Sequence, residues 1–315
     1  MAEDLFQRAP ADRDFIIPFR NAINAADDMI AGWEDVADEF TGAVLLYYGV
    51  LWFGNAVALC SLNSAVLNKR ARQHGLGIAS LPEGRRRFLN TRVNFGSAEE
   101  SLGIINLAFG GSSVSGQSVT VQDLLRLLPE MTRPLEHVHI NTKAIEVFPH
   151  SWSGDLEMFS SSNPSVVVQL VTEATITIPW LRDNIAIFPY LKSKDAAPLA
   201  GYDNIITWQR WADNEAPSGR TDVAELQALC IESAGKTYLL PKLKKRAISE
   251  YAAYLAVLYV IGHLARYYPD YWIEMQRDRI DDYFLIQEFL DLAEDKVPNL
   301  VLNYLSGATH VFRSS

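Results

Sequence analysis

The chain has 315 residues, of which 49% are hydrophobic and 21% charged, and its formal net charge is -10 at neutral pH. This composition predicts a globular protein with a large core, and it argues against indiscriminate binding to nucleic acid or anionic lipid except where a local patch reverses the charge. Cys60 and Cys230 stand far apart without a CxxC spacing, which disfavours a zinc site or disulfide and favours packed thiols in a reducing compartment.

The first predicted elements are two helices. Residues 12–39 have the apolar spacing of an acidic amphipathic helix, and residues 41–66 follow as a run without charge. This run is long enough to span a bilayer. However, Gly42, Gly49 and Ala56 recur every seven residues, which is typical of a close-packed seam on a helix buried in protein. The N-terminal stretch also lacks the apolar segment of a signal peptide. We therefore expect a cytoplasmic protein without a membrane span.

A basic segment, residues 69–92, follows the second helix and contrasts with the acidic chain. Its cations stand beside a single acid, Glu83. Arginine forks suit phosphate or carboxylate, and Phe88 and Phe95 could stack bases or anchor in a partner. The predicted contact residues, with cations near residue 245 added, are Lys69, Arg70, Arg72, His74, Arg85, Arg86, Arg87, Phe88, Arg92, Lys244, Lys245 and Arg246. The alternative is a solvated face that pairs with the protein's own acids at 23–39 and 278–295.

A Gly/Ser stretch at residues 111–118 has the spacing of a phosphate-binding loop, but Gln117 stands where that motif needs lysine. Without the cation, a connecting loop is the better interpretation. Thr120, with Asp123 three residues later, predicts the N-cap of a short helix over residues 121–131.

From about residue 140 the pattern becomes strand-like. The predicted strands are 143–149, 165–178, 185–191, 227–233 and 236–241, with Ala234-Gly235 as a turn. Segments rich in Ser, Pro and Gly at 151–164 and 196–221 are predicted joints between them.

Helical pattern returns in the last third of the chain. Residues 248–272 predict a second long apolar helix ended by Pro269, and residues 279–305 an amphipathic helix broken before Pro298. Two nearly uncharged helices remove most of their apolar surface from water when they pack on each other. The sequence thus predicts an α+β, mainly α fold, in which an N-terminal helical region (1–139) and C-terminal helices (242–315) form one helical core around an inserted β-containing region (140–241).

The histidines offer two candidate chemistries. Arg133 and His139 have the four-to-six-residue spacing of a metal-independent RNase pair, although Pro134 disfavours one helix through both. His137 and His139 would share a face in an extended segment, as metal ligands can. His263 lies on the second apolar helix and reads as a core histidine. Nothing fixes further ligands, so we expect no metal and no cofactor.

The segments 44-VLLYYGVLWFGNAVAL-59, His74-Gly75-Leu76, 124-LLRLLPEM-131, 264-LARYYPDYW-272 and 284-FLIQEFLDLAEDKVPNLVLNYL-305 resemble the YaaC-like family of bacterial proteins. The long helix followed by His-Gly is similar to the HEPN group, which includes RNases, RNA-binding partners and toxins. We expect a non-catalytic recognition or scaffold subunit that binds nucleic acid or an acidic partner protein, as a homo-oligomer or within a multi-protein, defence-associated complex. The alternative that the second resemblance implies is an HEPN-type RNase or toxin using Arg133 and His139.

Overall fold

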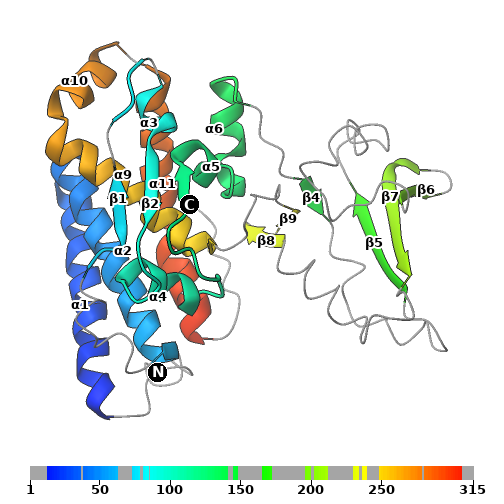
Figure 1. The fold of residues 1–315 in the computed structure, drawn as a ribbon, viewed down its shortest axis with the longest axis horizontal. Coiled ribbons are helices and arrows are strands. Elements are labelled where there is room, and N and C mark those ends of the chain that lie inside the picture. The colour runs from blue at the N-terminus through cyan, green and yellow to red at the C-terminus, as the bar shows by residue number, and fades with distance from the viewer. Residues whose placement is uncertain are drawn as a thin grey trace. The chain divides into compact units, whose positions relative to one another are not determined.

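The computed structural model describes residues 13–36, 38–62, 73–78, 81–84, 86–140, 145–147, 165–171, 196–199, 202–211, 230–233, 236–239, 248–278 and 280–306. The chain divides into two compact units (Figure 1). The first unit combines residues 1–140 with 246–315, and the second consists of residues 141–245.

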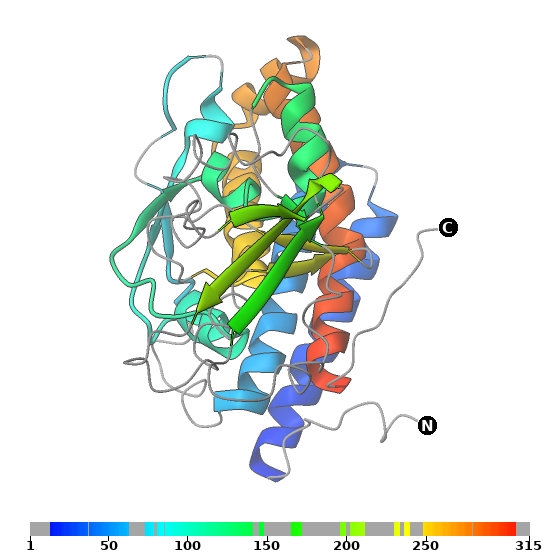
Figure 2. The same cartoon turned by 90° about the vertical axis from the view of Figure 1, so that its right-hand side faces the viewer.

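The first unit is mainly helical, as the sequence predicts. Its elements in chain order are α1 (Arg13–Asp35), α2 (Glu39–Leu62), β1 (Leu76–Ile78), α3 (Arg87–Asn90), β2 (Arg92–Phe95), α4 (Ser101–Ala108), β3 (Ser118–Thr120), α5 (Val121–Leu125), the 3₁₀ turn η3 (Pro129–Met131), α6 (Thr132–His137), α9 (Glu250–Tyr267), α10 (Pro269–Asp278) and α11 (Asp281–Ser306). The helices α1, α2 and α11 run beside one another (Figure 1 and Figure 2).

The two nearly uncharged helices, α2 and α9, pack on each other, which confirms that prediction. The Tyr251 hydroxyl of α9 donates to the Val50 carbonyl of α2 over 2.6 Å in the buried interior. At Gly262 of α9 the contact has space to spare, because a Cβ placed there would be 3.8 Å from Cβ of Tyr47, an ordinary van der Waals distance. The core of the unit therefore joins segments that lie about 200 residues apart.

The seam of small residues on α2 faces α1. A Cβ at Gly42 would lie 2.5 Å from the Trp33 ring, and one at Gly49 would lie 2.9 Å from Ile30. The helix α2 is long and apolar enough to cross a membrane, but 61% of its apolar window is buried inside the protein. Such burial is typical of a helix in the core of a folded protein.

A small antiparallel sheet in the order β1-β2-β3 packs beside the helices. Strand β2 alternates, with Arg92 and Asn94 exposed and Val93 and Phe95 buried. The segment before β3 is a connecting loop, as predicted, and the side-chain amide of Asn106 in α4 donates to its Ser112 carbonyl over 2.7 Å.

The predicted cap of the next helix is confirmed. Thr120 Oγ1 accepts the Asp123 N–H over 3.1 Å and donates to its carboxylate over 2.8 Å. However, α5 ends at Leu125 instead of continuing to residue 131, because Leu128 is extended and precedes Pro129, and a residue before proline disfavours the helical conformation.

Two prolines act differently in the C-terminal helices. Pro269 separates α9 from α10, as predicted. The predicted break before Pro298 is wrong, because α11 continues through it to Ser306. Val297 and Val301 are buried on either side of this proline, and the Asn299 amide donates to the Asp295 carbonyl over 2.7 Å. Packing thus outweighs the loss of one backbone hydrogen bond.

The described part of the second unit forms antiparallel strands, which agrees with the predicted β-containing region. The orders are β4-β9-β8 and β5-β7-β6. Their bounds are β4 (Ile145–Val147), β5 (Ser165–Val171), β6 (Ala196–Leu199), β7 (Tyr202–Trp211), β8 (Cys230–Ser233) and β9 (Lys236–Leu239). Strands β8 and β9 pair with Ser233 opposite Lys236. The predicted joint at 196–221 is wrong where it contains β6 and β7, and the predicted strand 185–191 lies outside the described residues.

Candidate functional site

Two arginines of the basic segment contact the protein's own acids. Arg86 donates to the Val138 carbonyl over 2.9 Å and lies 3.8 Å from the Asp281 carboxylate. Arg87 lies 3.7 Å from Glu274 and stacks over the Tyr271 ring at 4.9 Å. Arg86 thus pairs with an acid of the predicted stretch 278–295, whereas Arg87 pairs with Glu274, which lies outside the predicted acidic stretches. Both ion pairs are partly exposed, so each contributes little to stability.

The two phenylalanines of this region belong to the core. Phe88 is fully buried, and Phe95 is 3% exposed. The backbone N–H of Phe88 donates to Asp282 over 2.9 Å, and the Tyr271 hydroxyl donates to the same oxygen over 2.7 Å. Burial raises the pKa of Asp282 despite these bonds. The idea that Phe88 and Phe95 stack bases is therefore wrong, because neither ring is accessible.

Of the other predicted contact residues, Arg92 is exposed on β2. His74 is half-buried and is treated below. The predicted residues that lie outside the described part of the chain are Lys69, Arg70, Arg72, Arg85, Lys244, Lys245 and Arg246.

The structure places Arg133 and His139 near the two ends of one short helix. Arg133 is exposed near the start of α6, and His139 lies two residues beyond its end with a φ of 61°. His139 N–H donates to the Glu136 carbonyl over 2.9 Å, and Ile140 N–H donates to the Leu135 carbonyl over 2.8 Å. These bonds form a Schellman C-cap, so His139 has a structural role in ending the helix.

The idea of a metal site at His137 and His139 is not supported. His137 is helical, not extended, and its ring contacts Phe284 at 5.0 Å between centroids. No group of three or more His, Cys, Asp or Glu side chains suited to a metal occurs among the described residues.

A different cluster forms where residues 73–78 meet α2 and α9. The Tyr47 hydroxyl and Nδ1 of His74 share a hydrogen bond of 2.6 Å. The His74 ring also lies 6.1 Å from the ring of Tyr48 and 6.3 Å from that of Tyr259. Burial lowers the pKa of His74, and the charge of Arg266 lowers it further. The hydrogen bond to Tyr47 therefore orients the His74 ring, and its surroundings favour the neutral form.

Arg266 lies at the C-terminal end of α9 beside this cluster. Its Nε donates to the Gly262 carbonyl over 3.0 Å, Nη1 lies 3.4 Å from the Tyr48 hydroxyl, and the guanidinium stacks over Tyr267 at 5.4 Å. Tyr267 is 62% exposed. No carboxylate among the described residues lies within ion-pair distance of Arg266. Its charge is thus left available to an external anion.

His263 extends the same face of α9. Its ring lies 4.7 Å from that of Tyr267 and 6.1 Å from that of Tyr259. It is half-buried, not enclosed in the core. Burial and then Arg266 lower its pKa.

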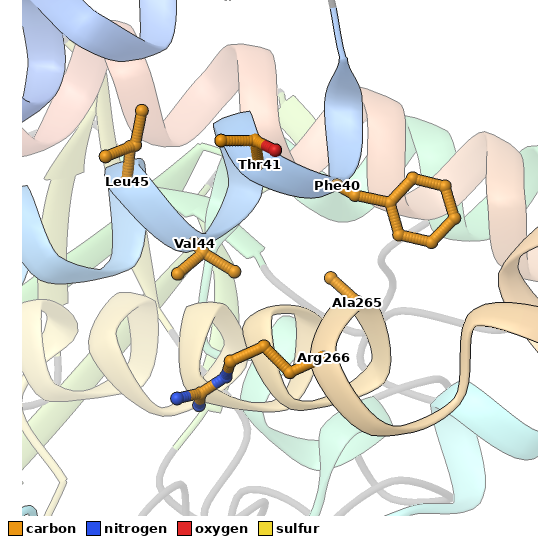
Figure 3. Close-up of a pocket in the computed structure, with 6 residues that line it drawn as sticks. All are labelled: Phe40, Thr41, Val44, Leu45, Ala265 and Arg266. Carbon is orange, nitrogen blue, oxygen red and sulfur yellow. The ribbon is translucent and has the colours of Figure 1, made fainter.

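A pocket of about 280 Å³ adjoins Arg266 between α2 and α9 (Figure 3). Val44 of α2 points toward Ala265 and Arg266 of α9, whereas the Leu45 side chain points away from α9 (Figure 3). The remaining lining residues are Phe40 and Thr41. The pocket is therefore apolar with a single cation.

We call the pocket and the adjoining ring cluster the Arg266 surface. Its residues are Phe40, Thr41, Val44, Leu45, Tyr48, His74, Tyr259, His263, Ala265, Arg266 and Tyr267. The sequence interpretation included His74 but missed the others. A signal was present, because Tyr259, His263 and Tyr267 follow one another at four-residue spacing and so line one helix face.

Comparison with known proteins gives one match. The family model described as YaaC-like Protein matches residues 34–305. No curated protein and no solved structure matches the chain. The resemblance to the HEPN group is not shown by these comparisons. The matched region covers all the residues of the Arg266 surface.

Proposed function

The chain belongs to the YaaC-like protein family, and we propose that it is a non-catalytic recognition subunit that binds single-stranded nucleic acid at the Arg266 surface. The observation that carries this proposal is the guanidinium of Arg266. It has no carboxylate partner among the described residues, although the chain carries a net charge of -10.

The chemistry around Arg266 fits a nucleotide strand. Its remaining N–H groups suit a phosphate oxygen. The exposed ring of Tyr267 offers a stacking face, and stacking is the sequence-tolerant part of single-strand binding. The neighbouring apolar pocket is large enough for one base. A nucleic acid fits better than an acidic protein, because rings and a cation occur together.

The test is fluorescence anisotropy with a labelled single-stranded oligoribonucleotide and the full chain. Arg266→Gln removes one charged hydrogen-bonding group and should weaken binding by about 10-fold to 100-fold. Tyr267→Ala should weaken it by about 5-fold or more. The matched control is Arg277→Gln, because Arg277 is exposed and pairs with its neighbour Asp278 over 2.7 Å; its binding should equal that of the wild type.

If the wild-type chain does not bind the oligoribonucleotide at low salt, the proposal is overturned. An acidic partner protein is then the ligand to test at the same surface. If Arg266→Gln and Arg277→Gln weaken binding equally, the interaction is a general attraction between charges and not recognition at the Arg266 surface. Strand integrity is followed in the same samples. Cleavage that Arg133→Ala or His139→Ala abolishes would replace recognition with the RNase alternative.

A further inference from the structure

The side chain of Arg266 folds back along α9 toward His263. Its Nε donates to the Gly262 carbonyl over 3.0 Å, so the guanidinium lies over the helical turn that carries His263. The Tyr267 ring contacts both groups, because its centroid is 5.4 Å from the guanidinium carbon and 4.7 Å from the centroid of the His263 ring. The imidazole therefore stands beside the cation that binds phosphate in the proposed function.

The two histidines of the Arg266 surface differ in their hydrogen bonds. Nδ1 of His74 lies 2.6 Å from the hydroxyl of the buried Tyr47. Burial raises the pKa of Tyr47, so this hydroxyl keeps its proton and donates it to Nδ1. A second proton on Nδ1 would deprive the hydroxyl of its acceptor, which is costly in the interior. His263 has no such obstacle, since neither of its ring nitrogens forms a hydrogen bond within the part of the chain that the structure describes.

Within the described ranges, Arg266 is the charge that acts on His263. Burial lowers the pKa of His263 below the ordinary value of 6.5, and the charge of Arg266 lowers it further. No described carboxylate of the elements that pack on α9, which are α2, α4, α5, α10, α11 and β1, shifts this pKa. The other titratable side chains of the ring cluster are Tyr47, Tyr48, His74, Tyr259, Tyr267 and Tyr268. One of the two causes that keep the imidazole neutral is therefore a charge that a bound anion neutralises.

A phosphate at Arg266 changes the electrostatics of His263. It neutralises the guanidinium and brings a negative charge close to the imidazole, and both effects raise the pKa of His263 in the complex. Above the pKa of the complex neither state is protonated, so protonation adds nothing to the affinity. As the pH falls below that value the complex gains a proton first, and affinity rises until the free protein is protonated as well. Binding should therefore strengthen as the pH falls.

We propose that His263 is a second phosphate-binding cation of the Arg266 surface, neutral in the free protein and protonated when a nucleic-acid strand is bound. His74 remains a neutral ring in both states. This inference rests on the proposed function at Arg266 and adds to it that recognition of the phosphate is coupled to the uptake of a proton by the neighbouring imidazole.

Fluorescence anisotropy with a labelled oligouridylate that ends in a 5′-hydroxyl tests this coupling in the full chain. The charge of each phosphodiester in this ligand is constant between pH 5.5 and pH 8. At constant ionic strength, the wild-type chain should bind about 5-fold more tightly at pH 5.5 than at pH 8. His263→Gln introduces a polar side chain that does not take up a proton, and it should reduce this ratio of affinities to less than about 2-fold.

Two further histidine variants are the matched controls. His137→Gln changes an exposed histidine of α6 that does not belong to the Arg266 surface. His74→Gln changes the ring that accepts a hydrogen bond from Tyr47. Each variant should keep the wild-type ratio of the affinities at the two pH values. A second readout is the NMR titration of the histidine Cε1–H signals, in which the signal missing from His263→Gln should titrate at higher pH once the strand is added.

The outcomes separate this inference from the proposed function. Wild-type binding that is equally tight at pH 5.5 and pH 8 overturns the inference and leaves recognition at Arg266 intact. A pH response that His263→Gln keeps, or that His74→Gln abolishes, overturns it as well, and so does a His263 signal whose midpoint the strand leaves unchanged. Absence of wild-type binding at both pH values overturns the proposed function and this inference together.

Discussion

His139 occupies a backbone conformation that side chains with a Cβ rarely adopt. Its φ of 61° is left-handed, and its N–H and that of Ile140 close the C-terminus of α6. Glycine is the usual residue at this position of a Schellman motif, since it lacks the Cβ that makes the conformation costly. A histidine at this position therefore either makes a specific contact through its imidazole or imposes a backbone strain that the rest of the fold tolerates.

The strain at this position can be measured directly. His139→Gly should increase the free energy of unfolding by about 0.5–1 kcal/mol, because relief of the left-handed strain exceeds the added chain entropy. His137→Gly, at the last residue of α6, should instead lower it by up to about 1 kcal/mol, because glycine disfavours the helix and the ring contact with Phe284 is lost. Urea unfolding followed by circular dichroism measures both. Destabilisation by both substitutions would mean that the His139 side chain, and not its backbone, stabilises the native state.

At the same scale, the sequence revealed residues whose partners are local. The cap by Thr120 was predictable, because Asp123 lies three residues away. The role of Phe88 was not, because its backbone partner Asp282 is 194 residues distant. Arg266 was missed for the same reason, since its availability depends on where the acids of the folded chain lie and not on its neighbours in sequence.

At the scale of elements, two glycines at the contacts of helix α2 leave different amounts of space for a side chain. A Cβ at Gly42 would lie 2.5 Å from the Trp33 ring of α1, whereas a Cβ at Gly262 of α9 would be 3.8 Å from its nearest neighbour on α2. The contact at Gly42 has no space for a methyl group, whereas the contact at Gly262 has enough.

Alanine substitution should therefore have opposite effects at these positions. Gly42→Ala should lower the free energy of unfolding by about 1–3 kcal/mol, because the overlap with Trp33 exceeds the gain in helix propensity. Gly262→Ala should raise it by up to about 1 kcal/mol, since alanine favours the helix and makes ordinary contacts. Thermal and urea unfolding measure both. A stable Gly42→Ala variant would show that Trp33 moves aside easily.

The long helices were predictable because each has either a sustained apolar periodicity, as in α1, or a long apolar run, as in α2, whereas the other elements depend on tertiary contacts. Helix α11 passes through Pro298 because Val297 and Val301 anchor it on both sides. The short strands β1 and β3 have three residues each, which is too few for a periodic signal. Strand β7 was missed because its segment was assigned to a joint that is rich in turn residues.

At the scale of the whole molecule, acidic charge limits where nucleic acid can bind. The chain repels phosphate at long range, so binding requires cations that are free of internal partners. Arg86 and Arg87 contact acids of the C-terminal helices, whereas Arg266 has no such contact among the described residues. The density of basic residues in the sequence is thus a weaker guide to a binding surface than the pairing in the folded chain.

The salt dependence of binding distinguishes these two surfaces. Each phosphate contact on a single strand steepens the plot of log affinity against log salt concentration by about 0.7. Binding through the Arg266 surface, which has one guanidinium, should give a slope of about -0.7 to -1.5, and Arg266→Gln should flatten it by about 0.7. Engagement of all seven cations of the basic segment would instead give about -5, and Arg92→Glu would then flatten the slope. Anisotropy titrations across a salt series measure this, and a steep slope that Arg266→Gln leaves unchanged would move the interface to the basic segment.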